Sequence, residues 1–119
     1  MGQNVKVAVI GGGASGVFAA ICAAESSAQA QVDIFEKSQL PLAKVRISGG
    51  GRCNVTHACF DPRELIDHYP RGSQELLGPF HKFCTGDTME WFEDRGVSLT
   101  VEADNRVFPV SNSSETIVD

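Results

Sequence analysis

Two apolar runs lie in the first third of the chain and predict two strands of one sheet. The first, Val5–Ile10, is apolar at nearly every position and ends at three consecutive glycines. The second spans residues 32–36, and residues 14–24 between the two runs have the small and apolar pattern of a packed helix. A strand that is apolar almost throughout is typical of a parallel sheet covered on both faces. The pattern therefore predicts a βαβ unit whose first strand is buried.

The pattern changes after this unit and predicts helices followed by a hairpin. Residues 44–47 alternate between polar and apolar side chains, which predicts a short strand or an extended loop before a second glycine triplet. Three helices are then expected, over residues 62–69, 73–84 and 88–95. Asp61 and Asp87 are the expected N-caps of the first and the third of these helices. Two further alternating segments predict a hairpin, over residues 97–101 and 106–110.

The first glycine cluster has the spacing of a nucleotide-binding turn. Gly11 permits a tight turn at the end of the strand, and Gly13 lets the backbone approach a pyrophosphate closely. Gly16 allows the following helix to lie close to the sheet, and Ala20 keeps the same face of that helix small. The N–H groups of the first helical turn then point at the phosphates, so the anion needs no basic side chain.

A carboxylate follows at the distance that this kind of site requires. Glu36 stands twenty positions beyond Gly16, at the carboxyl end of the second strand. In that place it can accept hydrogen bonds from a ribose diol, which favours an unphosphorylated adenosine ribose. The two features predict a dinucleotide site, but they do not separate FAD from NAD. An NAD-dependent dehydrogenase fragment and a non-catalytic nucleotide-binding module therefore stay open as alternatives.

A second glycine-rich loop carries further candidate chemistry. Residues 48–54 read SGGGRCN, and successive glycines can present several backbone N–H groups in a concave nest. Arg52 adds a guanidinium and Asn54 an amide, and the combination suits a pyrophosphate.

Three segments resemble one bacterial flavoprotein family. They are residues 44–56, KVRISGGGRCNVT, residues 68–72, HYPRG, and residues 106–111, RVFPVS. Together they are similar to the BaiN-type, or aminoacetone-oxidase-like, FAD-dependent oxidoreductases, and the resemblance covers essentially the whole chain. It implies an α/β Rossmann-type FAD/NAD(P)-binding fold, hydride or electron transfer by FAD, and NAD(P)H as a candidate electron donor.

The resemblance also implies which residues contact FAD, with Arg52 and Asn54 the strongest candidates of the second loop. The full set of cofactor-binding candidates is Gly11, Gly12, Gly13, Ala14, Ser15, Gly16, Glu36, Lys37, Lys44, Gly50, Gly51, Arg52, Cys53 and Asn54. No catalytic acid or base is identified in the sequence.

Family members are longer than 119 residues, so the chain is expected to be the N-terminal part of an FAD-binding domain. Residues 1–59 would hold the βαβ unit and the glycine loops, residues 60–119 would hold the helical segment and the hairpin, and the substrate domain would be absent. An incomplete sheet leaves an exposed edge, through which the chain could associate with itself.

Composition narrows the class of partner. The chain has 42% hydrophobic and 21% charged residues, which is typical of a soluble globular protein. A net charge of −5 argues against a nucleic-acid-binding surface, whose usual footprint is basic. No apolar stretch approaches the ~20 residues of a membrane helix, and no signal peptide is evident. We therefore expect a cytoplasmic protein with a small-molecule substrate and no membrane or nucleic-acid partner.

The cysteines allow two alternatives, neither of which is favoured. Cys53 and Cys59 could form a redox dithiol, but they enclose five residues where related disulfide reductases have four. The same two cysteines and His57 could bind a metal with Cys84 or His81 as the fourth ligand, although no CxxC pair supports this. No metal site is predicted. Cys22 is expected to be a small buried side chain of the first helix.

Overall fold

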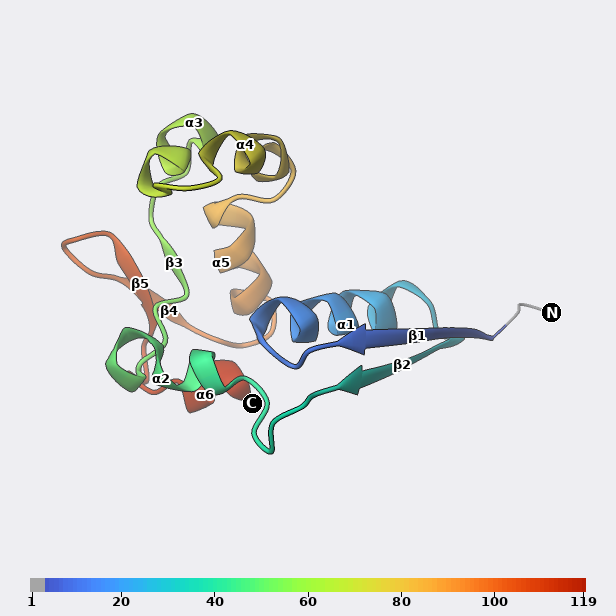
Figure 1. The fold of residues 1–119 in the computed structure, drawn as a ribbon. Helices are drawn as coiled ribbons and strands as arrows, with labels where there is room; N and C mark the ends of the chain where they lie inside the picture. Colours follow the sequence, from blue (N-terminus) through green and yellow to red (C-terminus); the bar gives the residue numbers. More distant parts are fainter. Residues whose placement is uncertain (1–3) are drawn as a thin grey trace. The chain divides into compact units, whose positions relative to one another are not determined.

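The computed structural model describes residues 4–119, which divide into two compact units at about residue 47 (Figure 1). The first unit contains β1 (Val5–Ile10), α1 (Ala14–Ser26) and β2 (Ala30–Phe35), and it ends with the first turn of α2 (Ala43–Gly51). β1 and β2 are parallel, with Val7 opposite Val32 and Ile10 opposite Phe35. The predicted βαβ unit is confirmed.

The helix α1 packs on one face of the two strands. Ala20 is buried on the helix, and a Cβ built on Gly16 would lie 3.4 Å from Cγ1 of Val9. The expectation that β1 is buried on both faces is wrong for this chain, because Val5 is 51% and Ile10 81% exposed. Successive side chains of a strand point to opposite faces, so residues 6, 8 and 10 lie on the face away from Val9. All three are exposed.

Residues 43–47 form a helical turn, which corrects the expected strand or extended loop. Arg46 N donates to Leu42 O at 3.0 Å, and the helical geometry ends at Ser48, whose ψ is 152°. Four alternating residues fit one helical turn as well as a strand, so the pattern alone could not distinguish them. The turn begins at Leu42, which has a φ of 57° in the left-handed region.

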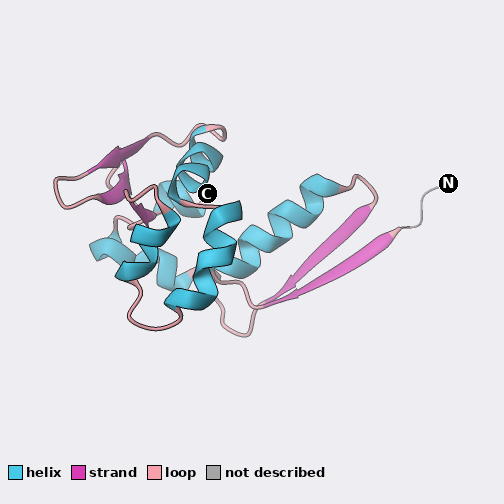
Figure 2. Cartoon of the chain, turned by 90° about the horizontal axis from the view of Figure 1, so that it is seen from above, coloured by secondary structure: helices cyan, strands magenta, loops and turns pink. Residues whose placement is uncertain are grey.

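The second unit combines short helices with a three-stranded antiparallel sheet (Figure 2). Its helices are α3 (Pro62–Leu65), the 3-10 turn η1 (Ile66–His68), α4 (Ser73–Lys82), α5 (Thr85–Glu93) and α6 (Glu115–Val118). Its strands lie in the order β3 (Thr56–His57), β5 (Arg106–Pro109) and β4 (Leu99–Val101). The predicted hairpin of β4 and β5 is confirmed, and β3 adds a strand that the sequence pattern did not reveal.

Two aspartates accept backbone hydrogen bonds at the starts of α3 and α5. Asp61 caps α3 as expected, because its Oδ1 accepts from Arg63 N at 2.8 Å and from Glu64 N at 3.4 Å. The expected cap at Asp87 is wrong, since α5 begins earlier, at Thr85. Asp87 instead lies in the first turn, where its Oδ2 accepts from Cys84 N at 2.8 Å. The carboxylate still satisfies a backbone donor at the helix start, from inside the helix.

The core of the second unit lies around β5. Val107 and Phe108 are fully buried, and Leu65 and Ile66 of the helical segment are buried as well. Buried Thr85 is satisfied by a hydrogen bond from its Oγ1 to His57 O at 3.0 Å. Outside this core, Cys22 is exposed on α1, which corrects its expected burial. No helix within residues 4–119 is long and apolar enough to cross a membrane.

We predict that Gly16→Ala destabilises the protein strongly. The added Cβ would lie 1.9 Å from Gly11 O, so the backbone of the glycine turn would have to shift. Overpacking of this kind costs about 1–3 kcal/mol of unfolding free energy, which chemical denaturation measures.

Gly86→Ala is the matched control, because a Cβ there would meet Phe60 at an ordinary 3.6 Å. It is expected to be neutral or to stabilise the protein by up to about 1 kcal/mol. Equal stabilities of the two variants would contradict the close approach of α1 to the turn.

Candidate functional site

The first glycine turn leads from the carboxyl end of β1 into α1 and is hydrogen-bonded to the carboxyl end of β2. Gly11 has a φ of 102°, which side-chain-bearing residues rarely adopt, and its N–H donates to Phe35 O at 2.8 Å. The chain then enters α1 with Gly13 as the N-cap residue. The reason for a glycine at position 11, a tight turn off the strand, is confirmed.

Gly12 is held through both of its backbone polar groups. Its N–H donates to Oε2 of Glu36 at 2.7 Å, and its carbonyl accepts from Leu42 N at 2.7 Å. A Cβ at this position would lie 3.0 Å from the same carboxylate oxygen. The end of β2 and the start of α2 therefore fix the shape of the turn.

The Glu36 carboxylate has a role that the sequence did not predict. Its Oε1 accepts from Ser38 N at 3.0 Å while Oε2 accepts from Gly12 N. These backbone N–H groups, Ser38 first and Gly12 second, hold the pKa of Glu36 below its ordinary value. The side chain is exposed, and each carboxylate oxygen has a second lone pair. Glu36 can thus lock the turn and still accept from ribose hydroxyls.

The amino end of α1 fits the phosphates of a dinucleotide. Gly13 has no side chain to cap the helix, and the first turn of α1 contains no acidic residue. A Cβ built on Gly13 meets no atom within 4 Å, so the space beside the backbone is open. Ala14 and Ser15 are exposed at this end. Uncapped N–H groups beside open space favour an anion.

The two lysines of the candidate set lie on the surface of the same unit. Lys37 follows Glu36 in an exposed segment, and Lys44 lies in the first turn of α2, also exposed. Their ammonium groups are available to a negatively charged ligand.

The second glycine loop is a tight turn of the second unit. Gly49, Gly50 and Gly51 have φ values of 57°, 67° and 87°, so the left-handed region is used three times in succession. A Cβ on Gly49 would lie 2.7 Å from Asn54 N and 2.8 Å from Cε1 of Phe108. The loop closes where Cys53 N donates to Ser48 O at 3.0 Å. Glycine is therefore required here by backbone geometry and by contact with the core.

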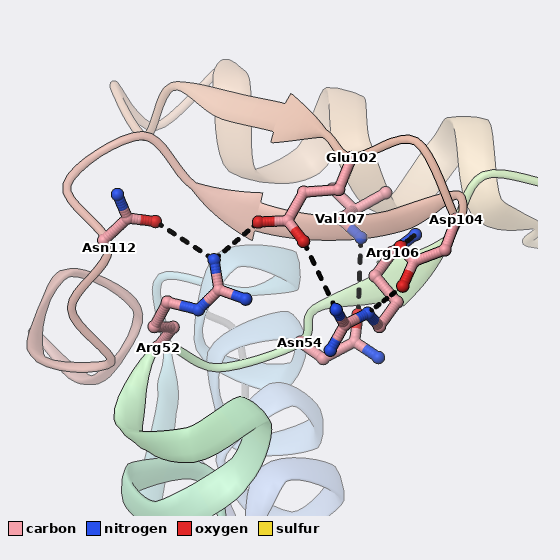
Figure 3. Close-up of polar contacts among 7 residues, drawn as sticks. All are labelled: Arg52, Asn54, Glu102, Asp104, Arg106, Val107 and Asn112. Atoms are coloured by element: carbon pink, nitrogen blue, oxygen red, sulfur yellow. Dashed lines mark hydrogen bonds and ion pairs between the residues drawn. The ribbon is translucent and has the colours of Figure 1, made fainter.

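The side chains of Arg52 and Asn54 contact the β4–β5 hairpin (Figure 3). Arg52 Nη1 lies 2.5 Å from Oε1 of Glu102, and the guanidinium lies 3.7 Å from the Phe108 ring centroid. In the amide orientation that satisfies both of its polar atoms, Asn54 donates to Thr56 O at 2.9 Å and to Val107 O at 3.3 Å. Arg52 and Asn54, the strongest candidates of this loop for contact with FAD, thus both attach the loop to the hairpin. Positions 50 and 51 are open, because a Cβ there meets no atom within 4 Å.

Neither Cys53 nor Cys59 has an activated thiolate. Cys53 is buried with a φ of 61°, and burial raises the pKa of its thiol. Burial also raises the pKa of Cys59, which keeps both members of the alternative dithiol protonated. Within the part of the chain that the structure describes, no three His, Cys, Asp or Glu side chains come together as metal ligands.

Three residues that shape these sites were missed by sequence reasoning. Leu42 carries no signal for its contact with Gly12, because leucine is unusual in the left-handed region. Glu102 lies in the predicted polar turn of the hairpin, with nothing local to mark its pairing with Arg52. Phe108 belongs to the segment that resembles the flavoprotein family, but its contact with Gly49 depends on the fold.

We predict that Glu36 makes the stability of the protein depend on pH. The pKa of Glu36 in the folded protein lies below its ordinary value, so the charged form contributes stability above the unfolded-state pKa. That contribution is lost as the pH falls through the lower, folded-state pKa. The melting temperature of Glu36→Gln should lie below that of the wild type at pH 7, and the gap should close in acid. A gap of constant size from pH 7 to about pH 3 would contradict the bonds to Gly12 and Ser38.

Comparison with known proteins identifies a Rossmann domain, which is the fold that the glycine turn indicates. A family model described as the HI0933-like protein Rossmann domain matches residues 5–119. The chain is 32% identical over 114 residues to the 3-dehydro-bile acid delta(4,6)-reductase of Clostridium scindens, which covers 96% of this chain and 27% of that protein. It is 27% identical over 117 residues to the ribosomal RNA dihydrouridine synthase of Escherichia coli, which covers 98% of this chain and 28% of that protein.

The chain thus spans about a quarter of the length of both relatives. The parallel βαβ unit and the glycine turn are those of a Rossmann-type domain, and the resemblance recognised in the sequence is confirmed. Over residues 5–119 the chain belongs to the HI0933-like Rossmann family, the family of the BaiN-type and aminoacetone-oxidase-like proteins.

Proposed function

We propose that this chain binds FAD and serves as the N-terminal cofactor-binding part of a flavin-dependent oxidoreductase. Its family and its fold make it a nucleotide-binding oxidoreductase module, and the choice of FAD is the proposal. The observation that carries dinucleotide binding is the turn at Gly11–Gly13, which Glu36 locks beside an uncapped and open helix terminus. The choice of FAD over NAD rests on the second glycine loop and the family.

Each group of residues has a distinct role in this proposal. The amides of residues 13–16 bind the pyrophosphate, while Glu36 accepts from the adenosine ribose through its remaining lone pairs. The loop of residues 48–54 supplies further contacts with the cofactor through Arg52, Asn54 and its open glycine positions. When bound, the isoalloxazine ring supplies hydride or electron transfer, and the protein supplies binding, orientation and electrostatics.

Two alternatives remain and differ in ligand. An NAD-dependent dehydrogenase would use the same glycine turn, since the turn and Glu36 serve either dinucleotide. The second glycine loop and the family favour FAD over NAD as the resident cofactor, with NAD(P)H as a candidate electron donor. A non-catalytic module would keep the turn without a complete flavin site.

The substrate of the whole protein does not follow from its relatives. By their names, one relative is a reductase of a 3-dehydro-bile acid and the other acts on ribosomal RNA. We propose a small-molecule substrate, because a net charge of −5 disfavours binding to a phosphate backbone. Ribosomal RNA is the second candidate, on the basis of the Escherichia coli relative alone.

Flavin uptake tests the proposal. The purified protein is incubated with FAD, freed of excess cofactor, and examined for visible flavin absorption. We expect bound FAD in the wild type and affinity at least about tenfold weaker in Gly13→Val. A Cβ at position 13 meets no protein atom within 4 Å, so the branched side chain would block the ligand and leave the fold intact.

Gly86→Val is the matched control, since it makes the same change at an exposed glycine of α5. Its FAD affinity should equal that of the wild type. Saturable NADH binding without flavin uptake would favour the dehydrogenase, and uptake of neither would favour the non-catalytic module.

A further inference from the structure

Two arginines, Arg52 and Arg106, lie against the buried ring of Phe108. The carboxylate of Glu102 joins them (Figure 3). The guanidinium of Arg52 lies 3.7 Å and that of Arg106 5.2 Å from the ring centroid. Glu102 bonds to Arg52 through Oε1 at 2.5 Å and to Arg106 through Oε2 at 3.4 Å. A residue of the hairpin turn thus holds a side chain of the second glycine loop, fifty positions earlier in the chain.

The backbone of Glu102 is itself fixed. Its N–H donates to Arg106 O at 2.9 Å, and its carbonyl accepts from Asn105 N at 2.9 Å. Arg106 is held on the same side by Asp104, whose Oδ2 lies 2.6 Å from Arg106 Nε. The carboxylate therefore projects from a closed hairpin turn, which makes it a firm anchor for Arg52.

Three consecutive glycines have little conformational preference of their own, so the shape of the loop depends on the bonds that hold it. These are Cys53 N to Ser48 O, Ser114 N to Gly51 O and the anchor through Arg52. Gly49, Gly50 and Gly51 are consecutive, and glycine loses more conformational freedom on ordering than any other residue. A ligand that binds a loosely held loop must pay for that ordering at the moment of binding. Arg52 is the side chain that links the end of this triplet to the hairpin.

We propose that Glu102 is a positioning residue for the cofactor: through Arg52 it holds residues 48–54 in their binding shape before the ligand arrives. This inference rests on the proposed function, in which that loop contacts FAD. Within residues 4–119 both hydrogen bonds of the Arg52 guanidinium use Nη1, to Glu102 and to Asn112. The Nε and Nη2 donors therefore remain for an anionic group while Glu102 keeps the guanidinium in place.

Glu102 also carries a negative charge, which by itself would disfavour a phosphate nearby. Its side chain is 34% exposed and already paired with two arginines, so solvent and ions screen most of that repulsion. The ordering of three glycines is a larger effect on binding than this screened charge. The two effects have opposite signs, so Glu102→Gln distinguishes them.

The first measurement is amide hydrogen exchange of the free protein. Glu102→Gln should speed the exchange of the Cys53 amide, which closes the loop by donating to Ser48 O, by about threefold. Asp104→Asn is the matched control, because it removes a charge from the same turn and loosens Arg106 without touching Arg52. Exchange of Cys53 in this control should equal that of the wild type.

The second measurement is the FAD dissociation constant in the same variants. We expect Glu102→Gln to raise it by about threefold and Asp104→Asn to leave it unchanged. In an Arg52→Ala background, or in Arg52→Lys if that protein does not fold, Glu102→Gln should have no further effect.

The outcomes separate the positioning role of Glu102 from the proposed binding of FAD. Unchanged or tighter FAD binding by Glu102→Gln overturns the positioning role alone, as does an equal loss in the Arg52-substituted background. Cys53 exchange that is unchanged by Glu102→Gln overturns it as well. A wild-type protein that binds no FAD overturns the proposed function and this inference together.

Discussion

The hydrogen bond from Gly12 N–H to the Glu36 carboxylate is the contact on which the first unit depends. It joins the turn after β1 to the residue that follows β2, and the carbonyl of the same glycine accepts from Leu42 N. The turn is therefore shaped by the protein before any ligand binds. A preformed turn lowers the ordering cost of binding, and an uncapped helix terminus supplies the donors. Glu36 acts as an internal brace as well as a candidate ribose ligand.

The second unit also holds a glycine segment in a fixed shape, but through a different interaction. Its glycine loop uses the left-handed region three times in succession and is pressed against Phe108. The loop is held by the ion pair between Arg52 and Glu102 of the hairpin. In the first unit, the corresponding contact is the hydrogen bond from Gly12 N–H to the Glu36 carboxylate. In both units a flexible glycine segment of the candidate set is held by a carboxylate distant in sequence. Such bracing is what a loop needs if it is to bind a ligand tightly.

Sequence reasoning predicted the features that depend on local chemistry. The turn at Gly11, the cap at Asp61 and the β4–β5 hairpin each follow from residue type and spacing. It failed where several states share one pattern, as for residues 43–47, or where a strand has two residues, as for β3. Contacts such as that of Arg52 with Glu102 could not be predicted, because only the folded chain brings them together. The exposure of Ile10 likewise depends on what packs against the sheet.

The central claim is that the preformed turn at the start of α1 binds the pyrophosphate of FAD. Amide chemical shifts measured by NMR during a titration test it most directly, with riboflavin, which lacks phosphate, as the comparison ligand. We expect the largest FAD-induced changes at the amides of residues 13–16 and small changes there with riboflavin. Equal changes with both ligands, or no change at these amides with FAD, would contradict the account.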